Sequence, residues 1–145
     1  MPSSPPACWR DPDGIQIGPN AAGGSLAPVE NPGTAAKPRV VDVKETDKLT
    51  ITDASGKPLS ALAVKAGETV EFKVENTTGV IPHNFYIGTP ADLQGNARDK
   101  LVGVPDFTTG SQTFRYQVPA SGQLQFACVV PGHYTTMHGD LAIQP

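Results

Sequence analysis

Apolar and polar residues alternate along short stretches from Arg39 onward, and this period of two is the strongest constraint on the fold. Val70, Phe72 and Val74 are the clearest case, because each is followed by a charged residue. Side chains of a β-strand point alternately to opposite faces, so the pattern is typical of a strand with one buried face. Shorter runs of this kind lie at 41–43, 49–51, 62–64, 114–118, 124–128 and 141–143. Because turn residues separate them, the runs predict an all-β chain folded as an antiparallel sandwich or barrel.

The first 38 residues have a different composition. They contain eight of the 15 prolines, several glycines and few large apolar residues. Such a stretch has little apolar surface with which to offset the entropy lost on ordering. We therefore divide the chain into a Pro/Gly-rich linker or arm, residues 1–38, and a folded domain, residues 39–145. Trp9 and Ile15 are candidate docking points for the arm, but disorder is the expected state.

Only one helix is expected, near residues 90–101. Thr89 suits the N-cap position and Pro90 suits the first helical position. Gly95 weakens a longer helix. The sequence therefore predicts either a short helix or an irregular loop here.

Charge and hydropathy exclude two classes of function. The formal net charge is −3, whereas a protein that binds nucleic acid needs a basic face. No apolar run is long enough to cross a bilayer as a helix.

The chain shows no charged start followed by an apolar stretch, the pattern that marks a signal peptide. Because Met1 stands directly before a Pro- and Ser-rich stretch, we expect that an export signal or membrane anchor has been removed upstream of it.

The segment from Cys128 to Met137 carries a thiol, an imidazole and a thioether within ten residues. Four residues separate Cys128 from His133, and three separate His133 from Met137. This set of sulfur and nitrogen donors favours copper over magnesium or calcium, which prefer oxygen ligands. One further imidazole would complete two His, one Cys and a weak axial Met, the ligand set of a blue-copper electron-transfer site.

His83 offers that imidazole, and strand parity places it on the correct face. Alternation puts the His83 side chain on the apolar, inward face of the segment 83–87. By the same rule, Cys128 shares an inward face with Leu124 and Phe126. Pro131 lacks an amide donor, so the chain leaves the strand and returns through a loop. The predicted ligands of one copper ion are therefore His83, Cys128, His133 and Met137.

Other interpretations of these residues remain open. A buried Cys alone is usually a small hydrophobe, and zinc accepts both Cys and His. Met137 argues against zinc as the natural metal, and His138 is an alternative ligand to Met137.

A disulfide between Cys8 and Cys128 is the simplest interpretation of two cysteines. Since Cys128 has a better use in the metal site, we expect Cys8 to be a free thiol, with an intermolecular link or lipid attachment as alternatives.

These motifs resemble the cupredoxin family of type 1 blue-copper proteins over roughly residues 39–145. The Cys-x4-His-x3-Met spacing, Pro131-Gly132-His133 and the Met-x-Gly-x-Leu pattern of residues 137–141 are similar to azurin and auracyanin. Pro82-His83-Asn84 is similar to plastocyanin instead. The segment 66–72 resembles the strand pair that precedes this histidine in many cupredoxins. The resemblance implies a Greek-key β-sandwich or barrel of about seven to eight strands.

The resemblance also implies a role for each site residue. His83, Cys128 and His133 would be the equatorial ligands, and Met137 the axial one. Asn84 would tie the two ligand segments together through hydrogen bonds. Pro82 stands where azurin has the glycine whose carbonyl approaches the metal, so this chain departs from azurin there.

The implied function is single-electron transfer by one mononuclear copper that cycles between Cu(II) and Cu(I), and not enzymatic catalysis. Electrons would pass through the exposed edge of His133, with Tyr134, Val130 and Pro82 as candidate docking residues. The implied partners are redox proteins such as a cytochrome or a membrane oxidoreductase. A copper carrier or storage protein with the same ligands is the alternative.

The remaining expectations concern location and assembly. The resemblance implies an extracytoplasmic protein, in the periplasm or at the outer face of a membrane. The N-terminal arm or a removed anchor would serve as a membrane tether. We expect a monomer. A self-contained copper oxidase needs a second copper site with further histidines, for which only His138 is left.

Overall fold

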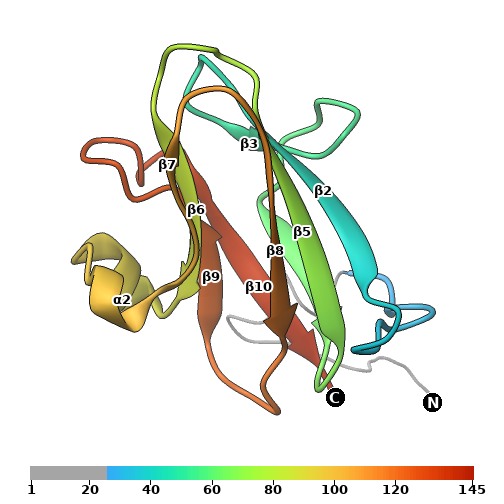
Figure 1. Ribbon diagram of the computed structural model, residues 1–145. Helices are drawn as coiled ribbons and strands as arrows, with labels where there is room; N and C mark the ends of the chain where they lie inside the picture. The colour runs from blue at the N-terminus through green and yellow to red at the C-terminus, as the bar shows by residue number, and fades with distance from the viewer. Residues whose placement is uncertain (1–25) are drawn as a thin grey trace, which may run out of the picture.

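The computed structural model describes residues 26–145, which fold into two facing layers of strands (Figure 1). Nine strands lie in this part of the chain: β2 (Arg39–Glu45), β3 (Ile51–Thr52), β4 (Ala61–Lys65), β5 (Thr69–Asn76), β6 (His83–Gly88), β7 (Val102–Phe107), β8 (Gly110–Gln117), β9 (Leu124–Ala127) and β10 (His138–Gln144). The expectations for Cys8, Trp9 and Ile15 fall outside the described residues.

The strands form an open sandwich and not a closed barrel. One sheet has the order β3-β2-β5-β8, and the other has the order β4-β10-β9-β6-β7. The predicted all-β sandwich is therefore confirmed. The expectation of purely antiparallel pairing is wrong for two pairs, because β2 runs parallel to β5 and β4 runs parallel to β10. Between β2 and β5 the chain crosses to the other sheet through β4, so β5 starts from the same end as β2.

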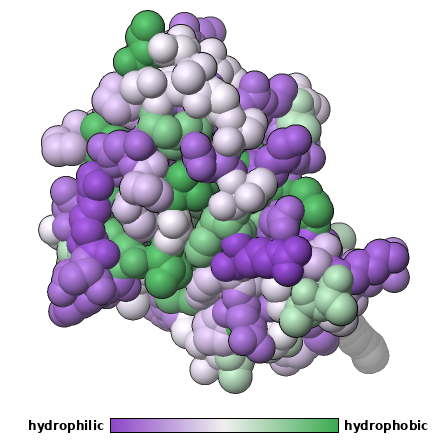
Figure 2. Space-filling model, in the orientation of Figure 1, coloured by the Kyte–Doolittle hydropathy of each residue, from purple (hydrophilic) through white to green (hydrophobic). Residues whose placement is uncertain are grey.

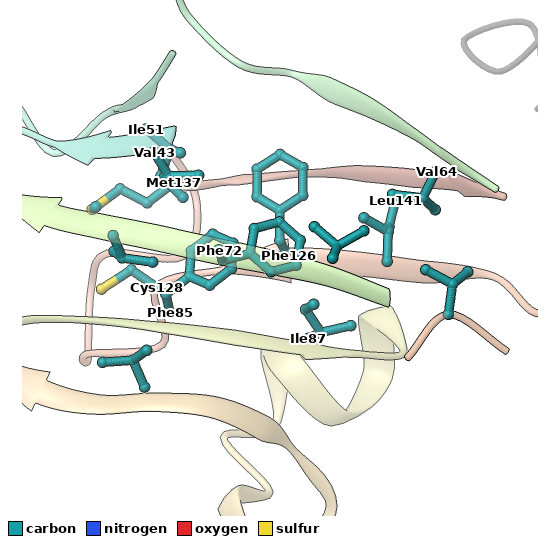
Figure 3. Close-up of a cluster of buried hydrophobic side chains, with 14 residues drawn as sticks. Val43, Ile51, Val64, Phe72, Phe85, Ile87, Phe126, Cys128, Met137 and Leu141 are labelled. Atoms are coloured by element: carbon teal, nitrogen blue, oxygen red, sulfur yellow. The ribbon is translucent and has the colours of Figure 1, made fainter. Parts of the chain in front are cut away.

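The core lies between the two sheets and is centred on aromatic rings. The rings of Phe72 and Phe85 lie 5.1 Å apart, and those of Phe85 and Phe126 lie 5.8 Å apart. Figure 3 shows these side chains between the layers. The alternation predicted for β5 is confirmed, since Val70, Phe72 and Val74 are fully buried. On the outer surface in the view of Figure 2, apolar residues form separate areas among polar ones.

Two elements differ from the sequence expectation. β7 was not predicted, because Gly103 and Pro105 interrupt its pattern. It is an edge strand, where a proline without an amide hydrogen is tolerated. Leu49, expected in a strand with Ile51, lies in the turn before β3 with φ 56°.

The predicted short helix is confirmed as α2 (Pro90–Gln94). The Thr89 hydroxyl oxygen accepts a hydrogen bond from the Asp92 amide, and Gly95 caps the other end. A single 3₁₀ turn, η2 (Arg98–Lys100), follows. Neither helix, nor any other within residues 26–145, has the length and apolar character needed to cross a membrane.

The described part of the predicted arm, residues 26–38, lies against the sandwich. The Gly33 amide donates to the Glu68 carboxylate at 2.9 Å, and the same carboxylate is paired with Arg39 at 2.7 Å. The Val29 amide donates to the Gln144 side chain at 2.8 Å. The division of the chain at residues 38 and 39 stays a prediction.

Gly139 provides a test of the packing, because β10 crosses close to the Phe126 ring there. A Cβ at Gly139 would overlap the far end of that ring and lie 2.9 Å from the Ser60 carbonyl oxygen. We expect Gly139→Ala to lower the free energy of unfolding by about 1–3 kcal/mol, since a packed aromatic ring must shift. Denaturant unfolding measures this. Asp140→Ala, at the exposed next position, is the control and should change it by less than about 0.5 kcal/mol. An unchanged Gly139→Ala protein would contradict the packing described here.

Candidate metal centre

The pairing of β6 with β9 brings two of the predicted ligands together. These strands are antiparallel, with Tyr86 opposite Ala127 and Ile87 opposite Phe126. His83 is the first residue of β6, and Cys128 directly follows the last residue of β9. Because the strands run in opposite directions, the start of one and the end of the other lie at the same end of the sandwich. Both side chains are fully buried there.

Three donor atoms converge at this end. The Cys128 Sγ lies 3.8 Å from His83 Nδ1 and 3.5 Å from His133 Nδ1. All three ligand atoms lie within 4.8 Å of one another. The two imidazole rings are 5.1 Å apart in an edge-to-face arrangement. Residues 45 positions apart are thus gathered into one cluster.

The loop between β9 and β10 is folded tightly by its own backbone. The His133 amide donates to the Val130 carbonyl at 2.8 Å, and the Met137 amide donates to the His133 carbonyl at 3.0 Å. The Cys128 amide donates to the Met137 carbonyl at 3.0 Å, which closes the loop at its base. Met137 is fully buried, and Figure 3 shows its sulfur pointing toward the same end of the sandwich as that of Cys128.

A backbone contact selects the nitrogen of His83 that faces the cluster. His83 Nε2 lies 2.9 Å from the Thr46 carbonyl oxygen, which can only accept a hydrogen bond. Nε2 therefore carries the proton, and Nδ1 keeps a free lone pair toward Cys128. A metal-binding histidine typically donates its other N–H in this way, which fixes the orientation of the ring.

Asn84 links the two ligand segments, as the family resemblance implied. Its backbone amide donates to Cys128 Sγ at 3.4 Å, and its side-chain oxygen accepts from the Val129 amide at 2.7 Å. Its side-chain nitrogen donates to Asp106 at 2.9 Å, and Arg98 pairs with the same Asp106 oxygen at 3.1 Å. Sequence reasoning did not single out Thr46, Arg98 or Asp106, because no local pattern shows that they reach this site.

The electrostatics of the site favour neutral side chains when no metal is bound. Burial raises the pKa of the Cys128 thiol to about 12, and the negative charges of Glu45 and Asp106 add to this effect. Burial lowers the pKa of His83, which the charge of His133 lowers further. Burial also lowers the pKa of His133. The imidazoles are therefore neutral at pH 7, and the thiol must lose a proton before it can bind a cation.

His138 is placed outside the donor cluster. Its Nδ1 lies 2.8 Å from the Tyr134 carbonyl oxygen, and its ring stacks on the Tyr134 ring at 4.5 Å. It begins β10, where it pairs with Ala127. The geometry thus brings His83, Cys128 and His133 together without His138.

The donor set fits copper. It combines one sulfur and two imidazole nitrogens in a largely buried cluster, with a buried thioether at the base of the same loop. Soft sulfur with imidazole selects copper or zinc over the hard cations that carboxylates and carbonyls bind. His83, Cys128, His133 and Met137 are arranged like a type 1 copper site.

Residues 57–144 match the family model of copper binding proteins of the plastocyanin/azurin family. The chain belongs to this family. Among its relatives, the copper-resistant cuproprotein CopI of Rubrivivax gelatinosus is 30% identical over 118 residues, covering 74% of this chain and 67% of the relative. Auracyanin-A of Chloroflexus aurantiacus is 26% identical over 102 residues, covering 57% of this chain and 63% of the relative. The chain thus spans about two thirds of the length of these relatives.

Solved structures support the cupredoxin fold. Reduced auracyanin from Roseiflexus castenholzii superposes with a TM-score of 0.61 at 21% identity and covers 78% of this chain and 100% of its own. Auracyanin A from Chloroflexus aurantiacus gives a TM-score of 0.59 at 22% identity, with 74% of this chain and 99% of its own covered. The resemblance stated from the sequence motifs is therefore confirmed at the level of the family and the fold.

Asn84 allows a test of the site geometry in the metal-free protein. We expect Asn84→Ala to lower the free energy of unfolding by about 1–3 kcal/mol, because the buried Val129 amide loses its acceptor. Hydrogen exchange should accelerate more at the Val129 amide than at the amides of β5, which respond only to the change in global stability. Gln112→Ala, at an exposed position of β8, is the control variant. Unchanged protection at Val129 would mean that Asn84 does not hold the two ligand segments together.

Proposed function

We propose that this chain binds one copper ion through His83, Cys128, His133 and the axial Met137, and that it carries single electrons. The observation that carries the proposal is the convergence of the buried Cys128 thiol, the buried His83 imidazole and the half-buried His133 imidazole at one end of the sandwich. Bound copper supplies the one-electron couple between Cu(II) and Cu(I). The residues supply a fixed set of donors.

Rigid donors suit electron transfer because the ligand positions need to change little between the two oxidation states. His83 is fixed by the Thr46 carbonyl, and Cys128 is fixed by the amides around it. The loop that bears His133 is closed by its own hydrogen bonds and is anchored by β10. Fully buried Phe85 and Phe126 belong to the same core cluster as Cys128 and keep water from this side of the site.

The partially exposed His133 marks the proposed path for electrons. It is the half-buried member of the cluster, whereas His83 and Cys128 are fully buried. Val130 and Tyr134 flank it in the same loop, and the exposed Pro82 precedes His83. We propose this surface as the docking site of a redox protein such as a cytochrome or a membrane oxidoreductase. Small and transient interfaces suit such encounters.

The relative named a copper-resistant cuproprotein favours a second candidate function. The same donors could hold copper as cargo, as a carrier or storage protein does. The relative rates of electron exchange and of copper release distinguish the two functions. An electron carrier exchanges electrons with a small redox protein much faster than it releases Cu(I) to a competing chelator, and a copper carrier shows the reverse order. We further propose that the chain is an extracytoplasmic and monomeric electron carrier without enzymatic activity.

Cys128 allows a test of the proposed site by visible absorption. We expect the copper-loaded, oxidised protein to show an intense visible band that disappears on reduction, because the band requires a copper–thiolate bond. Cys128→Ser should abolish the band. Cys8→Ser is the matched control and should keep it. Absorption spectra with and without reductant measure this. A colourless copper-loaded wild type, or a coloured Cys128→Ser protein, would contradict the assignment.

Proton release on metal binding tests the charge state of the site. Since the pKa of the Cys128 thiol is about 12 and the pKa values of both imidazoles are lowered, the thiol is the one donor of the three with a proton to lose near neutral pH. We expect about one proton released per Zn(II) between pH 7 and 9, and an affinity that rises about tenfold per pH unit. Calorimetry in buffers of different ionisation enthalpy measures this number. Cys128→Ser should release none. An excess over one proton that persists in Glu45→Gln, which has no carboxyl proton to lose, would show that an imidazole is charged.

A further inference from the structure

Glu45, the last residue of β2, has a buried carboxyl group that forms no hydrogen bond with any residue of 26–145. Its side chain is fully buried, and neither carboxylate oxygen has a partner among residues 26–145. The Thr77 amide donates to the backbone carbonyl of Glu45 and not to its side chain. Burying an unpaired carboxyl group costs several kcal/mol, so a partner is expected for such a group in the functional protein.

The position of Glu45 on β2 directs its side chain toward the metal end of the sandwich. Glu45 shares the inward face of β2 with Val43, which belongs to the same core cluster as Cys128 and Met137. Figure 3 shows Val43 and Met137 in the same core cluster. The next residue, Thr46, supplies the carbonyl that holds the His83 ring. The charge of Glu45 is close enough to Cys128 to raise the pKa of its thiol.

No described group serves as a partner of the Glu45 carboxylate. The ion pairs of residues 26–145 do not include Glu45. It also lies outside the cluster of three donors that are within 4.8 Å of one another. For a purely structural role at this position, an apolar residue of similar size would be more favourable than an unpaired acid.

We propose that Glu45 is a charge-compensating residue of the metal centre, whose carboxylate offsets the positive charge of the bound cation from outside the ligand set and favours divalent over monovalent ions. The inference rests on the metal site proposed above. Glu45 adds an anionic group to a site in which the donors other than the thiolate are neutral. In the metal-free protein burial raises the pKa of Glu45, and a cation nearby acts in the opposite direction.

The charge dependence gives the proposal a quantitative signature. The Coulomb energy between a fixed carboxylate and a cation is proportional to the charge of the cation. The energy lost by neutralising Glu45 is therefore about twice as large for a divalent as for a monovalent ion. At a pH above the raised pKa of Glu45, where the carboxylate is ionised before the metal binds, the fold-loss in affinity for the divalent ion should be about the square of the fold-loss for the monovalent one.

Competition titrations with Zn(II) and Ag(I), both redox-inert, test this on the full chain. We expect Glu45→Gln to weaken Zn(II) binding by about tenfold or more, and Ag(I) binding by about the square root of that factor. Asp47→Asn removes the same charge two residues away at an exposed position. This control should change neither affinity by more than about twofold, because exposed charges are screened by solvent and salt.

The metal-free variants separate a role in metal binding from a role in folding. Glu45→Leu, which removes the unpaired acid, should unfold at the same or a higher temperature than the metal-free wild type. Equal affinities of wild type and Glu45→Gln for both ions would overturn the proposal, and so would equal fold-losses for Zn(II) and Ag(I). A lower unfolding temperature for Glu45→Leu would overturn it too, by indicating a structural partner. A wild type that binds neither ion would instead contradict the proposed function itself.

Discussion

The antiparallel pairing of β6 with β9 is the constraint on which the site depends. It places the first residue of one strand, His83, beside the residue that follows the other, Cys128. Asn84 then joins the two segments, since its amide groups contact both Cys128 and Val129. The core rings of Phe85 and Phe126, on these same two strands, stack on each other inside the sandwich. The site is therefore a product of the sheet, and the loop that carries His133 and Met137 completes it.

Burial gives this site both its rigidity and its electrostatic character. The same desolvation that keeps His83 and His133 neutral also keeps the Cys128 thiol protonated until a cation binds. Neutral imidazoles are ready to bind a metal, while the thiol must exchange its proton for the cation. Glu45 belongs to the same balance, because an unpaired carboxyl group is costly in an apolar core and becomes favourable beside a positive charge.

The sequence was sufficient to predict the sandwich, α2 and the family, because period-two alternation and the ligand spacing are local patterns. Strand parity also placed His83 and Cys128 on inward faces, where the structure finds them. The parallel pairs and β7 were missed, because pairing partners far apart in sequence leave no local signal and Pro105 is tolerated only at an edge. The contacts of Thr46 and Asp106 with the site residues depend on the tertiary fold, so no sequence motif predicts them.

The thiolate of Cys128, the imidazoles of His83 and His133 and the thioether of Met137, held in place by the fold, are the proposed ligands of a single copper ion. X-ray absorption spectroscopy of the copper-loaded protein in both oxidation states tests this most directly. The account predicts one short copper–sulfur bond and two imidazole nitrogens, with distances that change little on reduction. A coordination sphere without the short sulfur bond, or one that gains or loses an imidazole on reduction, would contradict it.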